Sequence, residues 1–462
     1  MKKVSGSPLP LGVTYKNGRA NFAMEVPEGK TCKLLLYRKG EASLLASYVF
    51  SDRIGSVCYM AVDGLKEEAY EYNYDIDGER VTDSYAKALS GKEVWFKNIE
   101  ISEKSKENVR GIFYEDHYDW EADQSPRIQE EELIAYAIHV RGFTKDTHSK
   151  VKNKGTFQGI IEKIPYLKDL GINQIQCMPV YEFEEAGVRV NYWGYGPGYY
   201  FAPKSAYAKD GDGVKGLKDL VKYCHKAGIE VVLEMPFAEG ISGLMVTDCL
   251  RNYVMEYHVD GFRFDLMGLH DTETMNEIRA ALDCLPGGKE ILMYGEPWTA
   301  GKTAIQPGYE QALKCNAALL SDRIGFFNDD IRDSIKGSVF EVKETGFVNG
   351  AKGLETQIRS SVLGFCDGMG GYQPSSAHQS VSYVSAHDNY TLWDKLVHTL
   401  TDSMEPDFGA YNEVALAQNR LAAGIYFTCL GITFLQAGEE AARTKYGDDN
   451  SYRSAAKVNQ LD

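Results

Sequence analysis

Apolar and polar positions alternate in short runs over residues 1 to about 120. Alternation with a period of two is typical of half-buried β-strands, and turn-forming triplets separate the runs. Short strands at this spacing favour a β-sandwich. The clearest runs are residues 20–26, 32–37 and 70–78, with turns at 16–18 and 27–29.

The pattern changes after an acidic, polar stretch around Pro126, which we interpret as a linker. From about residue 130, apolar runs alternate with segments of helical period, such as 216–226 and 272–285. Eight strands alternating with helices predict an α/β protein, a (β/α)8 TIM barrel over residues 130–462 that follows the β-sandwich of residues 1–120. The expected barrel strands are residues 135–143, 173–180, 230–235, 261–267, 291–298, 317–322, 381–388 and 432–439.

One of these strands, residues 261–267, carries two opposite charges among apolar residues. Side chains alternate faces along a strand, so Arg263 and Asp265 point the same way. A buried charge without a partner costs several kcal/mol, so the two side chains must pair with each other or with a ligand. Taken alone, a structural ion pair and a functional site explain this pattern equally well.

Three carboxylates each close an apolar strand of the predicted barrel: Asp265, Glu296 and Asp388. In TIM barrels the active site lies where the strands end at their carboxyl side. Keeping three charges at one rim for packing alone would be costly. We therefore expect the three carboxylates to share one functional pocket.

Two carboxylates that face one bond are the minimum for glycoside hydrolysis. Arg263, on the same strand face, should keep Asp265 ionised, which suits a nucleophile. The apolar neighbours of Glu296 should raise its pKa and keep it protonated, which suits a general acid. His387 and Asp388 are placed to bind sugar hydroxyls and to stabilise a positively charged transition state.

The composition limits the cellular compartments and the binding partners that we expect for this protein. The chain has 462 residues, 44% of them hydrophobic and 25% charged, as in soluble globular proteins, and its net charge of −16 argues against nucleic acid as a partner. The nine cysteines lack C-x-x-C spacing and indicate free buried thiols in a reducing compartment. Without a secretory leader pattern or a membrane-spanning apolar run, we expect a cytoplasmic protein with no membrane partner.

Several motifs resemble one enzyme family. Residues 260–268, 294–298 and 384–389 resemble the second, third and fourth signature regions of the α-amylase superfamily, glycoside hydrolase family 13, and the first of them is most similar to type I pullulanases. Residues 1–120 are similar to the starch- or glycogen-binding-type module that precedes debranching barrels. The stretches 136–141, 436–440, 447–452 and 459–462 also resemble this family.

The resemblance implies roles for individual residues. Asp265 is expected to be the nucleophile, Glu296 the acid/base and Asp388 the transition-state stabiliser of a retaining mechanism. Arg263 and His387 are expected to line the subsite of the sugar whose bond is cleaved.

Four further residues are expected to bind substrate. The stretch 191–197 resembles the motif by which pullulanases and isoamylases present a stacking tyrosine, here Tyr195, with Trp193 beside it. Trp298 and Asn389 follow two of the carboxylates directly or closely and are expected to contact the sugar.

The implied activity is hydrolysis of α-1,6-glucosidic branch linkages in α-glucans such as pullulan, glycogen and amylopectin. Another α-glucan activity on the same barrel, isoamylase-like, α-1,4-acting or transglycosylating, is one alternative. A glucan-binding protein with impaired catalysis is the other, and it belongs to a different class. Retention of all three carboxylates favours the enzyme.

The first signature region departs from the family pattern. Glu234 stands where the family has an Asp, and Ala238 and Glu239 replace its Asn and His. The stretch between Glu234 and Asp265 is shorter than the family's usual third loop, which should weaken sugar binding and catalysis. We expect no required cofactor and no metal ligand set, although calcium is common in relatives. The family's last barrel helix and C-terminal β domain are expected to be absent before Asp462.

Overall fold

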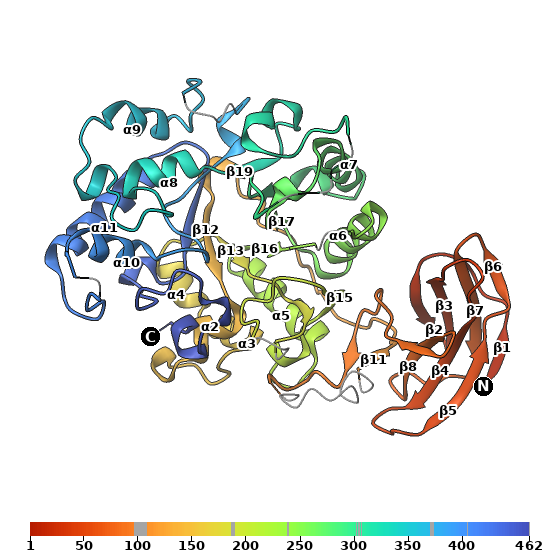
Figure 1. Ribbon diagram of the computed structural model, residues 1–462. Helices are drawn as coiled ribbons and strands as arrows, with labels where there is room; N and C mark the ends of the chain where they lie inside the picture. The colour runs from red at the N-terminus through yellow and green to blue at the C-terminus, as the bar shows by residue number, and fades with distance from the viewer. Residues whose placement is uncertain are drawn as a thin grey trace. The chain divides into compact units, whose positions relative to one another are not determined.

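The computed structural model describes residues 1–96, 109–185, 190–237, 240–301, 303, 305, 307–369, 374–403 and 405–461. The chain divides into two compact units (Figure 1). The β-rich unit comprises Met1–Ala122, Val180–Arg189 and Pro197–Asp219, and the barrel unit comprises Asp123–Pro179, Val190–Gly196 and Leu220–Asp462. Each unit has an apolar core of its own.

Two antiparallel sheets form most of the β-rich unit, as the alternating pattern predicts. One has the strand order β1-β7-β3-β2 with β6 paired to β7, and the other has β10-β11-β8-β4-β5 with β9 paired to β8. Phe22 and Met60 of the first sheet and Leu34, Leu36 and Tyr72 of the second are buried in one apolar cluster, so the two sheets share a core.

The strands of the β-rich unit are β1 Lys2–Val4, β2 Gly12–Lys16, β3 Arg19–Glu25, β4 Cys32–Arg38, β5 Leu44–Val49, β6 Asp52–Ile54, β7 Val57–Asp63, β8 Tyr70–Ile76, β9 Glu79–Val81, β10 Leu89–Ser90 and β11 Arg110–Ile112. A separate antiparallel pair, β14 Tyr181–Phe183 and β15 Gly198–Pro203, belongs to the same unit.

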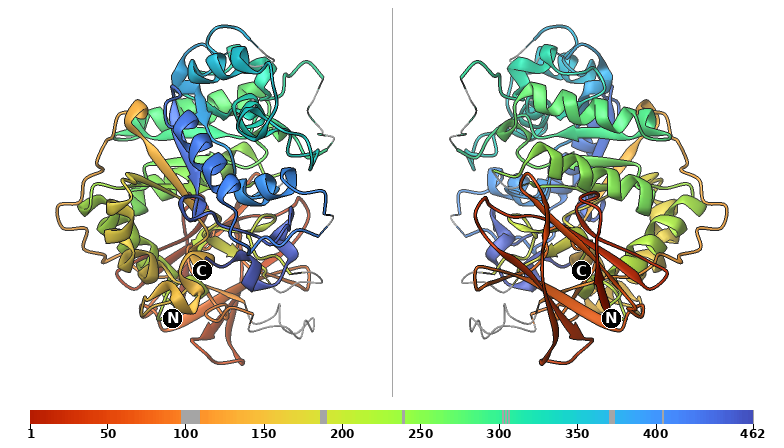
Figure 2. Two further views of the ribbon diagram at one scale, coloured as in Figure 1. Left: turned by 90° about the vertical axis from the view of Figure 1, so that its left-hand side faces the viewer. Right: turned by 90° about the vertical axis from the view of Figure 1, so that its right-hand side faces the viewer.

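Eight parallel strands close a barrel in the second unit, which confirms the predicted (β/α)8 fold. Their order around the barrel follows the chain, and helices surround them (Figures 1 and 2). The strands are β12 Ile134–Ile138, β13 Gln174–Cys177, β16 Glu230–Glu234, β17 Gly261–Phe264, β18 Leu292–Gly295, β19 Gly325–Phe327, β20 Ser380–Ser382 and β21 Ile432–Gln436. The helices are α2 Val140–Lys145, α3 Phe157–Glu162, α4 Ile164–Asp169, α5 Gly213–Lys226, α6 Gly243–Tyr257, α7 Thr272–Asp283, α8 Asp329–Lys336, α9 Glu355–Val362, α10 Leu392–Thr399 and α11 Glu413–Tyr426.

Side chains from different strands fill the interior of the barrel. Ala135, Val232, Tyr294, Phe327 and Phe434 come from five strands and lie in one buried apolar cluster. A packed interior of this kind leaves the ends of the strands as the place for chemistry.

The predicted sixth strand is wrong. Residues 317–322 do not form a strand: a 3-10 helix covers Lys314–Leu319, and the sixth strand is β19, Gly325–Phe327. Leu319 is 53% exposed, whereas Phe326 and Phe327 are buried. A three-residue strand followed at once by the helix cap of Asn328 is too short for a period-two pattern to single it out.

Other strands end earlier than their apolar runs. The first run was expected to extend to Phe143, but β12 ends at Ile138 and helix α2 begins at Val140. His139 caps this helix, because its Nδ1 accepts a hydrogen bond from the Gly142 amide (2.9 Å). The apolar residues of strand β12 and of the short helix α2 are nearly continuous in the sequence, so the pattern predicted a single longer strand.

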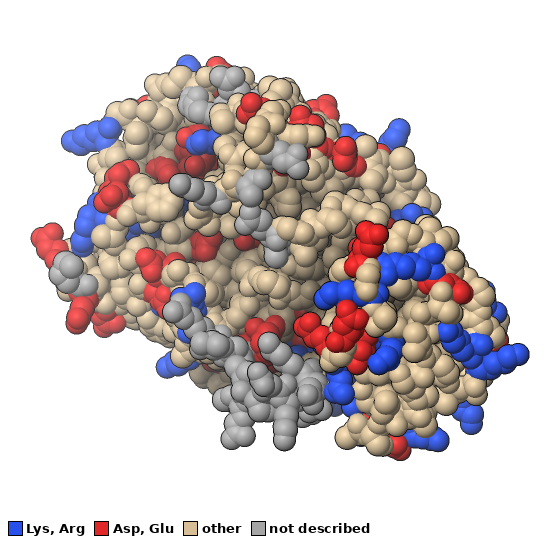
Figure 3. Space-filling model, turned by 45° about the vertical axis from the view of Figure 1, so that its right-hand side comes forward, with Lys and Arg blue, Asp and Glu red and all other residues tan. Residues whose placement is uncertain are grey.

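All nine cysteines are free thiols; Cys284, Cys315 and Cys366 are exposed rather than buried. Over the described part of the chain, no helix combines the length and the apolar character needed to cross a bilayer. On the face drawn in Figure 3, lysine and arginine side chains are interspersed with aspartates and glutamates. The expectation that nucleic acid is not a partner stays a prediction.

Candidate active site

Arg263 is the centre of a group of carboxylates at the carboxyl ends of neighbouring strands. Strands β17 and β18 pair in the register Arg263 to Tyr294 and Phe264 to Gly295, so Asp265 and Glu296 leave the barrel side by side. Arg263 Nη1 lies 2.5 Å from Asp265 Oδ1, and Nη2 lies 2.6 Å from Glu296 Oε1. The guanidinium is 1% exposed, so these charged contacts replace its hydration.

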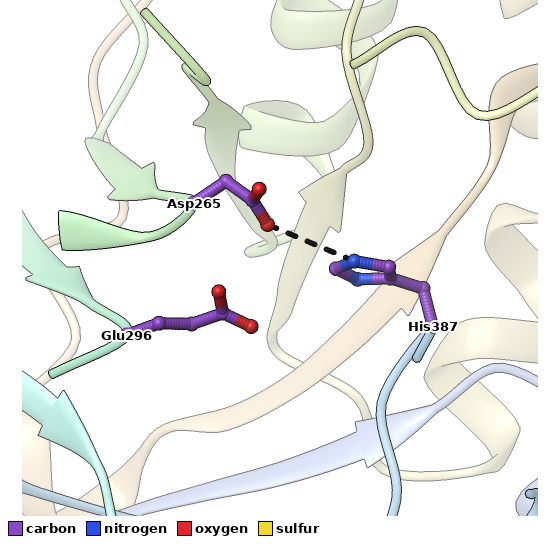
Figure 4. Close-up of side chains that lie close together, drawn as sticks. All are labelled: Asp265, Glu296 and His387. Atoms are coloured by element: carbon purple, nitrogen blue, oxygen red, sulfur yellow. Dashed lines mark ion pairs between the residues drawn. The ribbon is translucent and has the colours of Figure 1, made fainter. Parts of the chain in front are cut away.

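The predicted carboxylates meet a histidine at this rim. Single ligand atoms of Asp265, Glu296 and His387 all lie within 4.8 Å of one another (Figure 4). His387 Nε2 is 3.7 Å from Asp265 Oδ1 and 3.5 Å from Asp388 Oδ2. The Asp388 side chain is 46% exposed and therefore stands at the open side of the group.

Glu296 has the electrostatics of a proton donor. Its burial raises the pKa of the carboxyl to about 8; Arg263 acts against this rise, and the negative charges of Asp265 and Asp388 add to it. The Leu266 amide donates a hydrogen bond to Glu296 Oε2 (2.9 Å). Leu266 has a φ of 47°, in the left-handed region, so a strained backbone residue helps to hold this carboxyl.

The imidazole of His387 is fixed by aromatic rings. The Tyr195 ring stacks on it with a centroid distance of 4.8 Å and an interplanar angle of 25°, and the Trp193 ring meets it edge-on at 4.9 Å. Burial, and then the charge of Arg263, lower the pKa of His387 to about 3. The ring is therefore neutral at ordinary pH and serves as a hydrogen-bonding group beside Asp265.

Trp193 and Tyr195 pack against the His387 ring and are held by hydrogen bonds of their own. The Trp193 indole is 5% exposed, and its Nε1 donates to Asn459 Oδ1 (2.9 Å). The Tyr195 hydroxyl donates a hydrogen bond to Glu234 and lies 3.2 Å from His387 Nδ1. Their expected contact with substrate stays a prediction.

Glu234 takes part in this group although its region departs from the family pattern. Its carboxylate accepts hydrogen bonds from Tyr195 and from the Gln176 amide, and it lies 3.7 Å from Arg263 Nη1. Burial raises the pKa of Glu234 to about 7, with Arg263 acting against the rise. Ala238 and Glu239, the other altered positions, lie outside the described residues.

Lys445 is a residue of the site that sequence reasoning missed. Its buried ammonium donates to the carbonyl oxygen of His387 (3.1 Å). The loop that carries it is held by Asp394, which accepts from Thr444 Oγ1 (2.5 Å) and from the Lys445 amide (2.8 Å). Only its position shortly after the eighth strand hinted at such a role.

A cavity of about 190 Å³ opens beside the carboxylates. Glu296 and Asp388 form part of its wall, together with Trp298 and Asn389, two of the residues expected to bind substrate. The cavity is large enough for a sugar ring, and it combines an indole with polar side chains, as carbohydrate sites do.

Asp265, Glu296 and His387 are also close enough to bind one metal ion. Arg263 already pairs with both carboxylates, and a cation would have to compete with its guanidinium. Calcium prefers an all-oxygen shell, which this group does not supply. The expectations about calcium and cofactors stay predictions.

Comparisons with known proteins agree with this fold. A family model described as the α-amylase catalytic domain matches residues 137–237. A pullulanase of Bacillus subtilis is 28% identical over 457 residues, covering 85% of this chain and 62% of that protein. The chloroplastic isoamylase 3 of Oryza sativa subsp. japonica is 26% identical over 581 residues, covering 100% and 71%.

Solved structures give the same result. The pullulanase of Paenibacillus barengoltzii in complex with maltohexaose and α-cyclodextrin has a TM-score of 0.85 at 27% identity, covering 99% of this chain and 78% of that one. The pullulanase of Bacillus acidopullulyticus has a TM-score of 0.83 at 28% identity, covering 98% and 60%. The resemblance to pullulanase-type and isoamylase-type enzymes of the α-amylase superfamily is confirmed. The chain spans less than two thirds of the length of the B. subtilis pullulanase.

Proposed function

We propose that this protein is a glycoside hydrolase that cleaves α-1,6-glucosidic branch linkages in α-glucans with retention of configuration. The observation that carries the proposal is the bridge of Arg263 between Asp265 and Glu296, with carboxylate oxygens within 4.8 Å of each other. Retaining enzymes place their two carboxyl groups about 5–5.5 Å apart, which is consistent with this separation.

Each carboxyl group has a distinct task in the proposed reaction. The Asp265 carboxylate attacks the anomeric carbon while Glu296 gives its proton to the leaving oxygen, and a covalent glycosyl ester forms. Glu296, now a carboxylate, then takes a proton from water as that water displaces Asp265. The pKa of about 8 at Glu296 supports the first step, because the carboxyl carries its proton at neutral pH.

The remaining residues stabilise charge and orient the sugar. Asp388, at the open side of the rim, stabilises the positive charge that develops at the anomeric carbon. Neutral His387 offers Nε2 to a sugar hydroxyl, with Tyr195 and Trp193 holding its ring. Trp298 and Asn389 bind sugar in the adjacent cavity.

The choice of α-1,6 linkages rests on the relatives, which include a pullulanase and isoamylases. Maltohexaose and α-cyclodextrin are bound in the P. barengoltzii structure, which supports an α-glucan as substrate here. By the same resemblance, we propose that residues 1–120 act as a glucan-binding module. The altered first signature region favours a second candidate, a glucan-binding protein with little catalysis.

The test measures new reducing ends with pullulan and, separately, with amylose. Release from pullulan alone supports debranching, and release from amylose supports α-1,4 action. An Asp265→Asn variant should abolish release while the protein stays folded. Asp63→Asn, the same chemical change at a surface ion pair of the β-rich unit, is the matched control. Retention on immobilised glycogen without release from either substrate would establish the binding protein instead.

A further inference from the structure

Lys336 presents an unusual amine to the cavity beside Glu296. It is the last residue of helix α8, its side chain is 1% exposed, and it lines the cavity. Its ammonium forms no hydrogen bond or ion pair with any residue that the structure describes. A buried ammonium without a partner is costly in free energy. The pKa of Lys336 is therefore lowered to about 7, mainly by burial and next by the positive charge of Arg332.

The neighbouring charged groups of the cavity already have partners. Arg332, one helical turn earlier, pairs with Asp333 (2.7 Å) and donates to the Tyr383 hydroxyl (3.1 Å). Asp329 accepts a hydrogen bond from Lys314 Nζ at 2.9 Å. Among the described basic residues of helix α8 that line the cavity, Lys336 is therefore the one without a hydrogen-bonding partner.

The position of the cavity indicates which part of a substrate would enter it. Glu296 and Asp388 line it, whereas Asp265 and His387 do not. In the proposed reaction Glu296 protonates the oxygen of the leaving group, so the leaving sugar lies on the Glu296 side of the cleaved bond. Phe340, 83% exposed, and Trp298 add apolar ring surface to the same cavity.

We propose that Lys336 is a specificity-determining residue whose amine hydrogen-bonds a hydroxyl group of the glucose unit that occupies this cavity. The ligand is an uncharged sugar rather than a phosphate or carboxylate, because Asp329 and Asp388 line the same space and Arg332 is already paired with Asp333. The inference rests on the proposed function, since the leaving side is defined by Glu296 as proton donor.

Binding is measured first, in protein that cannot turn substrate over. Maltose is titrated into the Asp265→Asn protein and into the same protein carrying Lys336→Met, and affinity is read by calorimetry. We expect binding to weaken about tenfold, the effect of losing one hydrogen bond. Lys336→Gln keeps an N–H donor and should recover part of the affinity. Lys222→Met is the matched control, because Lys222, on helix α5, is also buried but does not line the cavity.

A second measurement uses the unmutated chain. Lys336 is labelled with an amine-acylating reagent near neutral pH, and the modified peptide is quantified by mass spectrometry. Maltose should protect Lys336 and leave the exposed lysines unprotected, and inorganic phosphate should protect none. Equal labelling with and without maltose, or protection by phosphate alone, would overturn the inference.

The two proposals fail in different ways. If neither pullulan nor amylose is cleaved but maltose still protects Lys336, the hydrolase proposal fails and the sugar site stands. If pullulan is cleaved and Lys336→Met leaves both kcat/KM and maltose affinity unchanged, the inference about Lys336 fails alone.

Discussion

The guanidinium of Arg263 lies 2.6 Å from the carboxyl group of Glu296, which leaves the barrel from the neighbouring strand. This contact lowers the pKa of Glu296, but burial has the larger effect and raises the pKa to about 8. The same guanidinium reaches Asp265 with its other terminal nitrogen. One buried cation thus holds the proposed nucleophile and the proposed proton donor at a fixed separation.

The pKa of Glu296 predicts the alkaline limb of activity. The general acid must carry its proton, so kcat/KM on pullulan should fall above about pH 8, tenfold for each further pH unit. Initial rates from about pH 5 to about pH 10 measure this limb. A decline centred near pH 5, the range of an ordinary glutamic acid, would contradict the assignment of Glu296 as acid.

Replacing Arg263 with lysine should break one of its two contacts with the carboxyl groups of Asp265 and Glu296. A single ammonium cannot make the two contacts of the guanidinium, and the pKa of Glu296 should rise because Arg263 lowers it. We expect kcat to fall at least about 100-fold and the alkaline limb to move to higher pH.

The control for this change is Arg279→Lys. Arg279, on helix α7, is also buried; it pairs with Asp283 (2.9 Å) and donates to the carbonyl oxygens of Gly288 and Ile291. The Arg279→Lys variant should have a lower thermal unfolding temperature, but the pH dependence of its kcat/KM should not shift. Equal losses of activity in both variants would show that Arg263 acts only through folding.

Removal of the Lys445 amine should affect catalysis through His387 and Asp388. Its hydrogen bond to the His387 carbonyl fixes the backbone. Burial raises the pKa of Asp388, and the positive charge of Lys445 acts with that of Arg263 against this rise. Lys445→Met should therefore reduce kcat about tenfold or more with a smaller change in KM. Lys222→Met, on helix α5, removes another buried amine with the same change in shape and should leave kcat nearly unchanged; similar losses in both variants would argue against this role of Lys445.

A histidine in the barrel unit should make stability depend on pH. His225 Nδ1 lies 3.1 Å from Asp123 Oδ1, and its Nε2 lies 2.9 Å from Asp260 Oδ2. Burial alone would lower the pKa of His225, but these two carboxylates raise it to about 9. Because this pKa exceeds the unfolded value of about 6.5, the stabilisation is complete below about pH 6.5 and is lost as pH rises through about 9.

Urea unfolding of a His225→Gln variant measures this effect. At about pH 6 the variant should be less stable by about 3 kcal/mol, and the difference should shrink at about pH 10. His148→Gln is the control, since the His148 side chain is 73% exposed and should matter little. A stability difference that does not change with pH would rule out the ion pairs as its source.

The sequence by itself determined most of the fold and the place of the chemistry. Seven of the eight barrel strands coincide with apolar runs, and Asp265 and Glu296 follow their strands directly. Parallel strands bring their carboxyl ends to one rim, so local pattern was enough to predict that these groups gather. The sixth strand was missed because its three residues are followed at once by the cap residue Asn328, whereas β20, equally short, is continued by the buried Tyr383 and Val384.

Only the tertiary structure decided which side chains touch. The two contacts of Arg263, the bond from Tyr195 to Glu234 and the reach of Lys445 to His387 join residues far apart in the chain. The same holds for the cavity in which Lys336 has no hydrogen-bonding partner among the residues that the structure describes. Local pattern reports the period of the backbone, whereas these contacts depend on packing between distant segments and on the lengths of individual side chains.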